Sequence, residues 1–452
     1  MPGFSMLLKC LSIALLLCCS PLASAAEQST SDTPDNAQLP LNELRIFTDV
    51  FNQIRLSYVE PIDDKTLLEN AVKGMLTGLD PHSAYLDGKN FDDLKESTSG
   101  EFGGLGLEVG TENGYIKIIS PIDDTPASRA GLESGDLIIK LDDKAVKDMS
   151  LDTAIKLMRG PKGSKINLTI IRQGRQQPFD ITLTRDIIKV TAVRAKLLAP
   201  GFGYLRIAQF QAQTGENTAK QISQLIKDNK APLKGLVVDL RNNPGGILQA
   251  SVKVVDNFIN DGLIVYTEGR LKNSEARYHA TEGDMLDGAP IVVLINGGSA
   301  SASEIVAAAL QDQKRAIIVG TPSFGKGSVQ SVSRLPNDGE LTLTWSHFVT
   351  PSGYVLHNLG VPPNICSISE HDNAESIVAE VLKNASDLSR LMAAWRKVSV
   401  DNKHARMTLK QNCPVNTKLR RIDVLIAEKL ISDTTLYSRI LGISDSLASV
   451  HN

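Results

Sequence analysis

The chain has 452 residues, more than one ordinary core accommodates, so two to four domains are expected. Its 48 basic and 51 acidic residues give a formal net charge of −3, whereas nucleic-acid binders usually carry a basic excess. Aromatic residues make up only 5% of the chain, and the sequence shows no platform on which bases could stack.

Residues 1–26 have the pattern of a secretory signal peptide. Lys9 supplies a positive charge, residues 11–19 are apolar, and Ala23-Ser-Ala25 matches a cleavage site. The apolar run is too short for an ordinary transmembrane helix, although an uncleaved N-terminal anchor is the alternative. We therefore expect a soluble, exported protein, located in the periplasm of a Gram-negative bacterium.

Residues 27–98 are expected to form a flexible lead-in followed by a helical segment. Residues 27–39 are rich in Ser, Thr, Asp, Gln and Pro, a composition that favours disorder. Apolar residues then recur at helical spacing over residues 41–58, and a second helix is predicted over residues 64–79.

Residues 99–187 are expected to form a separate, β-rich unit. The unit opens with Gly103-Gly-Leu-Gly-Leu107, and Asn113-Gly114 predicts a hairpin turn. A helix is predicted over residues 151–158, where apolar residues recur at helical spacing. Further strands are predicted over residues 165–172 and 178–184. The whole arrangement resembles a PDZ domain.

This resemblance implies that the unit binds the C-terminus of a peptide. Backbone N–H groups of the glycine-rich loop would hold the terminal carboxylate, and the peptide would add as a strand whose side chains face the helix. The alternative is that the glycines only serve a tight turn. The residues expected to form the groove are Gly103, Gly104, Leu105, Gly106, Leu107, Leu151 and Ile155.

Residues 188–365 show alternating strand and helix patterns, which predict an α/β core with a parallel sheet. The predicted strands are 203–209, 235–240, 290–295 and 315–320. Ligands of such sheets bind at the carboxyl ends of the strands. Two glycine-rich turns, residues 244–246 and 297–299, lie at such ends.

The stretch Asn296-Gly-Gly-Ser-Ala-Ser-Ala-Ser-Glu304 lies between a predicted strand and a predicted helix. A sharp turn there lifts one side chain out of the backbone path and leaves the next amides at a helix N-terminus, where negative charge is favoured. This placement suits a serine nucleophile and half of an oxyanion hole. Ser301-Ala-Ser-Glu304 also fits a capping box, so a nucleophile needs a partner base to be distinguished from a cap.

Lys326 is the candidate base. It lies between Gly325 and Gly327 in a loop that follows a predicted strand. Glycines let the backbone approach closely, and a lysine desolvated in such a pocket has a lowered pKa and can take a proton from a serine. Gln330, four residues on, would fall on roughly the same side and could orient the Lys326 amine. An ordinary surface lysine is the alternative.

The motifs at residues 296–304 and 324–330 resemble those of the carboxyl-terminal processing proteases, serine peptidases of family S41 that use a Ser–Lys dyad. The resemblance implies that Ser301 is the nucleophile, Lys326 the base and Gln330 its helper. The backbone N–H groups that it implies for the oxyanion hole are those of Gly245, Gly246 and Ala302.

The same resemblance implies an α/β protease core of the ClpP/crotonase superfamily, carrying a PDZ domain and helical segments at both ends. The N-terminal helices would contribute to a homodimer. The substrates would be proteins with exposed, unstructured or apolar C-termini, cleaved by an exported endopeptidase, with an adaptor protein as a further partner. No spacing of metal ligands and no phosphate loop is found in the sequence, and no cofactor or nucleic acid is expected.

Two alternatives are kept beside this interpretation. A Ser–His–Asp triad that uses His347 or His357 is the rival catalytic arrangement. A non-catalytic scaffold of the same fold, which binds peptides or apolar ligands, is the rival function. A third histidine, His82, follows Asp80-Pro81 at a helix end, where capping or packing explains it better than catalysis.

Residues 366–452 carry helical patterns, and their role is left open between extending a dimer interface and covering the protease core. Cys366 and Cys413 are the two cysteines that remain after the signal peptide. An exported protein can pair them, but the sequence does not show whether their Cα atoms lie close enough.

Overall fold

The computed structural model describes residues 39–86, 98–122, 124–147, 149–189, 191–281, 283–337, 339–369 and 373–443. Its contacts divide the chain into two units with the boundary after Asn70, and each unit is described by itself. The predicted signal peptide lies outside the described residues. Within the described ranges, none of the helices combines the length and apolar character that a membrane span requires.

Both predicted N-terminal helices are present. Helix α1 (Leu41–Ser57) belongs to the first unit, and α2 (Asp64–Thr77) crosses the boundary into the second. None of the α1 residues is buried in the described structure, so its apolar stripe is exposed. The exposed apolar side chains of α1 are Leu41, Leu44, Ile46, Phe47, Val50 and Leu56. A stripe of exposed apolar side chains of this kind is typical of a surface that binds another molecule.

The predicted β-rich unit contains an antiparallel sheet with the strand order β3-β4-β5-β7-β8. Its elements are β3 (Leu107–Glu112), β4 (Tyr115–Pro121), α4 (Pro126–Arg129), β5 (Leu137–Leu141), β6 (Lys144–Ala145), α5 (Leu151–Met158), β7 (Lys165–Ile171) and β8 (Phe179–Thr184). The predicted hairpin turn is confirmed, since Asn113 and Gly114 join β3 to β4 with φ angles of 52° and 80°. Apolar residues of the sheet and α5 share one buried cluster, which gives this unit its own core.

The core sheet has the strand order β10-β11-β12-β15-β16-β19. Its strands are β10 (Val193–Ala199), β11 (Phe202–Ile207), β12 (Gly235–Asp239), β15 (Ile291–Ile295), β16 (Ala316–Gly320) and β19 (Ile365–Cys366). The five strands from β11 to β19 are parallel, which confirms the predicted sheet, while the edge strand β10 runs antiparallel to β11.

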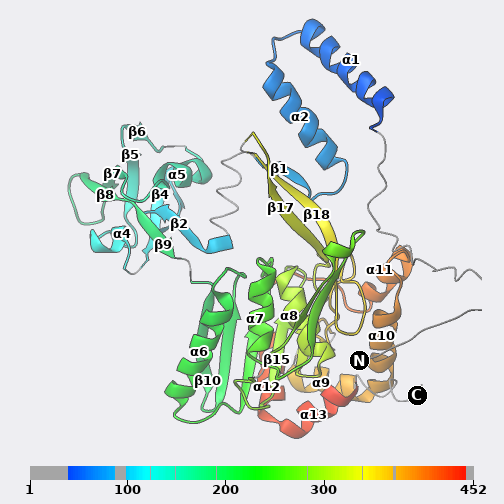
Figure 1. Ribbon diagram of the computed structural model, residues 1–452. Coiled ribbons are helices and arrows are strands. Elements are labelled where there is room, and N and C mark those ends of the chain that lie inside the picture. The colour runs from blue at the N-terminus through cyan, green and yellow to red at the C-terminus, as the bar shows by residue number, and fades with distance from the viewer. Residues whose placement is uncertain are drawn as a thin grey trace, which may run out of the picture. The chain divides into compact units, whose positions relative to one another are not determined.

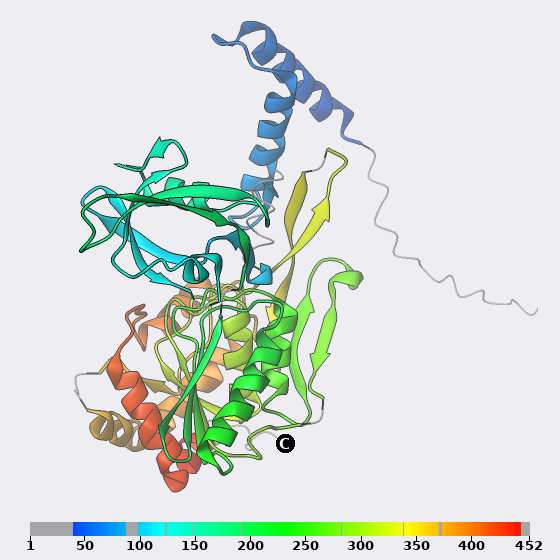
Figure 2. The same ribbon diagram turned by 90° about the vertical axis from the view of Figure 1, so that its left-hand side faces the viewer.

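Helices cover both faces of this sheet (Figure 1, Figure 2). Alternate residues of β15 enter two different buried clusters: Ile291 and Val293 pack on one face, Val292 and Leu294 on the other. The first face is covered by α6 (Thr214–Asn229), α7 (Leu248–Asp256) and α8 (Ala302–Asp312), and the second by α9 (Ala374–Lys383), α12 (Arg421–Ser432) and α13 (Thr434–Ile443). The C-terminal helices therefore cover the core, which was one of the two roles left open.

A second, antiparallel sheet stands beside the core. Its strands are β1 (Ala84–Leu86), β13 (Leu263–Glu268), β14 (Ala276–His279), β17 (Ser328–Arg334) and β18 (Glu340–Val349). Short connecting elements complete the fold: the 3₁₀ turn η1 (Lys272–Ser274), α10 (Ala385–Lys397) and α11 (Lys403–Gln411). The pairing that the sequence left open is present, since Cys366 and Cys413 form a disulfide with their Cα atoms 5.8 Å apart.

Candidate active site

Three loops meet at one edge of the core sheet. Strands β12, β15 and β16 are adjacent and parallel, so their carboxyl ends lie side by side. We name the loops that follow these strands the oxyanion turn (residues 240–246), the nucleophile turn (residues 296–301) and the lysine loop (residues 321–327). The fold thus brings together the three motifs that the sequence singled out.

The oxyanion turn and the nucleophile turn are held together by reciprocal hydrogen bonds. The N–H of Asn242 donates to Asn296 Oδ1, and Asn296 Nδ2 donates to Asn242 Oδ1, both at 2.8 Å. The carbonyl of Asn243 accepts the N–H of Ala300 at 3.0 Å and the hydroxyl of Ser303 at 2.9 Å. The two asparagine side chains therefore fix the relative position of the turns.

Gly245 lies directly against the predicted nucleophile. A Cβ atom built on Gly245 would lie 2.8 Å from Cβ of Ser301 and 3.0 Å from N of Ala302, closer than real Cβ contacts. Its φ angle of 101° also lies in the region that favours glycine. Only glycine therefore lets the oxyanion turn approach this closely.

Two of the three predicted oxyanion donors have free N–H groups. The N–H of Gly245 is already bonded to Asn243 Oδ1 at 2.9 Å, so it is not available to a substrate. For the N–H groups of Gly246 and Ala302, the described residues supply no acceptor. Ala302 is the first residue of α8, where an unpaired N–H faces outward from the helix N-terminus. These two groups are the candidates to bind an oxyanion.

Ser301 has a strained backbone, with φ 55° and ψ −114°. It occupies the turn from β15 into α8, the arrangement in which a strand-to-helix turn presents a nucleophile. Its neighbours Ser299 and Ser303 are fully buried and donate to Leu240 O and Asn243 O. Ser301 alone of the three remains half-buried, so its side chain is the one that a substrate can reach.

Glu304 is a fully buried carboxylate that joins the nucleophile turn to the lysine loop. Its Oε2 accepts the N–H of Ser301 at 2.7 Å and the N–H of Lys326 at 2.8 Å. Its Oε1 accepts the N–H of Gly325 at 2.7 Å and the Ser323 hydroxyl at 2.5 Å. Because one oxygen receives both amides, the backbones of Ser301 and Lys326 are adjacent. Glu304 reaches back to Ser301 as a capping residue does, but it also fixes the loop that carries Lys326.

The environment of Lys326 favours its neutral form. The side chain is half-buried, and this burial lowers the pKa of Lys326, while the negative charge of Glu304 opposes part of the shift. Burial raises the pKa of Glu304, against the effect of its four hydrogen bonds. A lysine with a lowered pKa next to a strained, accessible serine can act as the base of a nucleophilic dyad.

Gln330 does not bond to Lys326 in the described structure. It lies on β17, and its Nε2 donates to Ser328 Oγ at 3.0 Å and to Thr344 Oγ1 at 3.3 Å. The pairing of β17 with β18 shifts register between Val329 and Gln330, and such a bulge re-aims side chains. Residues i and i+4 fall on the same side only of a regular backbone, and this stretch is not regular, so Gln330 does not face Lys326 as predicted.

The histidines are placed poorly for a triad. His347 and His357 have ring centroids 4.9 Å apart, and the Nδ1 atom of each is buried without a hydrogen-bond partner among the described residues. A Ser–His–Asp triad needs a carboxylate on the N–H of the histidine Nδ1, and the part of the chain that the structure describes supplies none to either ring. The backbone N–H of His82 donates to Asp80 Oδ1 at 2.7 Å, which fits the capping role predicted for this helix end.

The β-rich unit has a groove beside its edge strand β3. A cavity of about 200 Å³ lies between β3 and α5. Of the predicted groove residues, Gly104, Leu105, Gly106, Leu107 and Ile155 line it; Gly103 and Leu151 do not. Gly103 instead lies in β2 (Glu101–Gly104), which pairs with β9 (Asp186–Lys189). The lining residues that sequence reasoning missed are Phe102, Val109, Met158 and Arg159, and the helical spacing from Ile155 could have indicated Met158.

Replacing Glu304 by alanine should lower both stability and activity. Four donors would lose their acceptor, and each buried donor left unpaired costs about 1–3 kcal/mol. We expect Glu304→Ala to have a lower Tm and a kcat reduced by about tenfold or more, because the two loops lose their shared contact. Thermal unfolding and steady-state kinetics measure both effects. The exposed Glu275→Ala is the matched control, and wild-type Tm and kcat in Glu304→Ala would contradict the linking role.

Comparisons with known proteins show which families the chain is similar to. The model of peptidase family S41 matches residues 201–367, a PDZ domain model matches 103–183, and a model of the N-terminal domain of the activating protease CtpB matches 18–90. A carboxy-terminal-processing protease of Bartonella bacilliformis is 49% identical over 348 residues, which cover 76% of this chain and 79% of the relative. The carboxy-terminal processing protease CtpA of Bacillus subtilis is 33% identical over 354 residues, covering 78% and 73%. A solved photosystem II D1 C-terminal processing protease aligns with 71% of this chain and 92% of its own, at 29% identity and a TM-score of 0.42. The family models and the sequence relatives confirm both resemblances predicted from the motifs.

Proposed function

Since this chain belongs to the carboxy-terminal processing proteases of peptidase family S41, we propose that it is a serine endopeptidase that works through a Ser301–Lys326 dyad. The single observation that carries this proposal is the Glu304 carboxylate, which accepts the backbone N–H groups of both residues. The half-buried Lys326, the strained Ser301 and the free N–H groups beside them support the same chemistry.

In the proposed reaction, neutral Lys326 takes the proton of the Ser301 hydroxyl while Oγ attacks the substrate carbonyl carbon. The N–H groups of Gly246 and Ala302 stabilise the oxyanion of the tetrahedral intermediate. The intermediate collapses to an acyl-enzyme as the C–N bond breaks, and the leaving amine takes the proton from the Lys326 ammonium. Lys326 then removes a proton from water as the water attacks the acyl carbon. The second tetrahedral intermediate collapses as the bond to Ser301 Oγ breaks, Oγ takes the proton back from the Lys326 ammonium, and the new C-terminus is released.

The PDZ domain is proposed to select substrates by their C-terminal carboxylate. Strand β3 is an edge strand of its sheet, so a peptide can add beside it. Leu105 and Gly106 line the groove directly before β3, and their backbone N–H groups can hold a carboxylate. Apolar groove residues such as Ile155 suit apolar tails.

The test compares one unstructured substrate with a free C-terminal carboxylate and with a C-terminal amide. A charge-assisted hydrogen bond is worth about 1.5–3 kcal/mol, so we expect kcat/KM for the amide to fall by about tenfold or more. Ile155→Ser should reduce this preference, and Ile119→Ser, on the exposed part of β4, is the matched control. Equal kcat/KM for acid and amide would rule out carboxylate capture and leave the dyad assignment standing.

Export and self-association are part of the proposal. The Cys366–Cys413 disulfide supports an oxidising compartment, in line with the predicted signal peptide and a periplasmic location.

The exposed apolar stripe of α1 supports pairing with a second copy, which should give the purified protein the native mass of a dimer. A monomeric mass at micromolar concentration would contradict it. The ClpP/crotonase assignment and an adaptor partner stay predictions.

A further inference from the structure

One C-terminal segment contacts all three loops of the active site. We name residues 406–423 the C-terminal brace; it comprises the end of α11, a loop and the start of α12. The carbonyl of Asn416 accepts the N–H of Gly297 at 2.8 Å and the hydroxyl of Thr321 at 3.1 Å. One atom of the brace thus contacts both the nucleophile turn and the lysine loop.

The brace makes further contacts with the same loops. Lys410 Nζ donates to the carbonyl of Phe324 at 3.1 Å, two residues before Lys326. Asn296 Nδ2, which also bonds the oxyanion turn, donates to the carbonyl of Thr417 at 3.0 Å. These contacts use polar atoms within the loops themselves, so movement of the brace would be transmitted to them.

The oxyanion turn is tied to the brace by a buried ion pair. Arg241 Nη1 donates to the carbonyl of Arg420 at 2.8 Å and to Asp423 Oδ2 at 2.9 Å. The Arg241 and Asp423 residues are only 4% and 2% exposed, and Asp239 pairs with the other side of the guanidinium. A buried, bidentate arginine holds a fixed geometry. The brace therefore fixes the position of Arg241, the second residue of the oxyanion turn.

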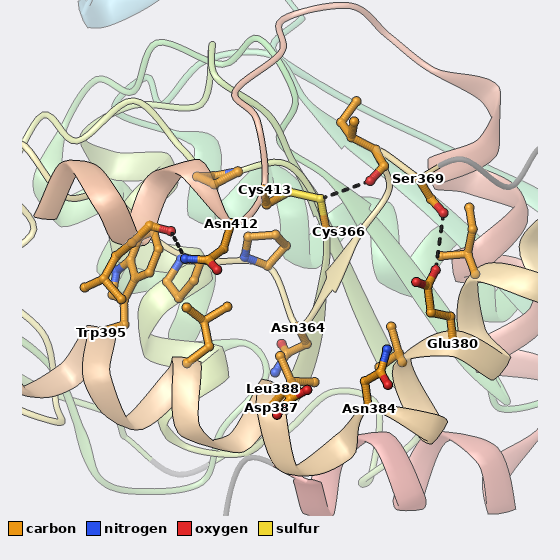
Figure 3. A pocket seen from close by; sticks show the side chains of 18 residues that line it. Asn364, Cys366, Ser369, Glu380, Asn384, Asp387, Leu388, Trp395, Asn412 and Cys413 are labelled. Atoms are coloured by element: carbon orange, nitrogen blue, oxygen red, sulfur yellow. Dashed lines mark hydrogen bonds between the residues drawn. A yellow bond between two sulfur atoms is a disulfide. The ribbon is translucent and has the colours of Figure 1, made fainter. Parts of the chain in front are cut away.

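The disulfide fixes the middle of the brace to the core sheet. Cys413 lies in the brace, and Cys366 ends β19, the neighbour of the strand that leads into the lysine loop. A pocket of about 610 Å³ opens beside this disulfide, and both cysteines line it, together with Pro322 of the lysine loop (Figure 3). The volume of this pocket fits a small thiol, and of the two cysteines that line it Cys366 is half-buried and Cys413 is 6% exposed.

We propose that the C-terminal brace is a positioning element of the protease site and that the Cys366–Cys413 disulfide holds it in register, so that opening this disulfide with a dithiol lowers proteolysis. The inference rests on the proposed protease function of Ser301 and Lys326. The step is a thiol–disulfide exchange. One thiolate of the dithiol attacks a sulfur of the disulfide, and its second thiolate then closes the reagent to its own disulfide. The protein gains two electrons and two protons and ends with two free thiols.

The first test measures kcat and KM of the wild-type protein before and after treatment with dithiothreitol, with free thiols counted to confirm reduction. We expect kcat to fall by about tenfold or more with KM little changed, because displaced catalytic groups slow the chemical step. The Cys366→Ala/Cys413→Ala double variant should match the reduced wild type and should not respond to dithiothreitol. A wild-type kcat that is unchanged after complete reduction would overturn the inference.

The second test keeps the disulfide and cuts single contacts of the brace. Thr321→Val removes the hydroxyl that bonds Asn416, and Lys410→Met removes the donor to Phe324 O. Both variants should lower kcat at an unchanged KM and shift the rise of kcat/KM to more alkaline pH, because a loosened lysine loop hydrates the Lys326 amine. Lys403→Met, on the same helix but outside the brace and exposed, is the matched control. Variants with a lower Tm but wild-type kcat and pH profile would show a purely structural brace and overturn the positioning role.

A third readout separates this inference from the protease assignment. Hydrogen exchange of the amides in residues 296–304 and 321–327 should become faster on reduction, while the amides of α6 stay unchanged. Protein that cleaves no substrate in its oxidised form would refute the proposed function, yet faster exchange in the two loops would still support the brace. Exchange that is unaffected by reduction would refute the brace even if the protein is an active protease.

Discussion

The Ser301→Ala variant should keep its fold and lose cleavage by about 10⁴-fold or more, the usual effect of removing a nucleophile. Its N–H can still donate to Glu304, because this bond is made by the backbone. The loss should therefore appear in kcat and leave Tm close to that of the wild type. Ser303→Ala should have a much milder effect, since its buried hydroxyl bonds Asn243 O of the oxyanion turn and faces no substrate.

Fragment mapping by mass spectrometry on an unstructured substrate measures this loss. The wild type should give defined internal cleavage products, and Ser301→Ala should give none above the uncatalysed level. Turnover by Ser301→Ala close to that of the wild type would remove Ser301 from the mechanism. It would also favour the alternative in which the fold is a binding scaffold and the observed cleavage comes from a contaminant.

Lys326→Met should reduce kcat by a similar factor of about 10⁴, because the methionine side chain cannot accept the serine proton. The backbone N–H that bonds Glu304 is kept, so the lysine loop should hold its place. Lys227→Met, on the exposed side of α6, is the matched control. Steady-state kinetics should show the loss in kcat with little change in KM. A wild-type kcat in Lys326→Met would exclude this lysine as the base.

The pH dependence of the wild type follows from the same group. The base must be neutral, so kcat/KM should rise with pH as Lys326 loses its proton, through a pKa that burial places below the ordinary lysine value of about 10.4. A histidine base would titrate near pH 6.5, and burial lowers the pKa of His357 further, so its profile would be flat above neutral pH. Rates measured between about pH 6 and pH 10 distinguish the two bases. A plateau that begins near neutral pH would favour the triad.

Much of the local structure could be predicted from the sequence, because it depends on short-range signals. The short, apolar, β-branched run at residues 290–295 predicts a buried strand, and the observed strand is Ile291–Ile295. Asn113-Gly114 predicts a hairpin through its backbone preference alone. The alternation of strands and helices predicts that loops at residues 240–246, 296–301 and 321–327 share one edge.

The remaining features depend on contacts between distant residues, which a single sequence does not specify. From its neighbouring residues alone, Glu304 is predicted to be a helix-capping residue. Its bonds to Gly325 and Lys326 form only once β15 and β16 pair. The register shift next to Gln330 depends on its partner strand. The role of residues 406–423 depends on hydrogen bonds to loops that lie at least 86 residues earlier in the chain, the separation between Lys410 and Phe324.

The most direct test of the dyad is to locate the acyl-enzyme. The wild-type protein would be mixed with an activated ester of a short peptide, quenched in acid within seconds, digested, and mapped by tandem mass spectrometry. With a Ser301–Lys326 dyad, we expect an acyl group on Ser301 in the wild type, none at this position in Ser301→Ala, and very little in Lys326→Met, where the serine lacks its base. An acyl group on a residue other than Ser301, formed at a rate that supports turnover, would contradict the account.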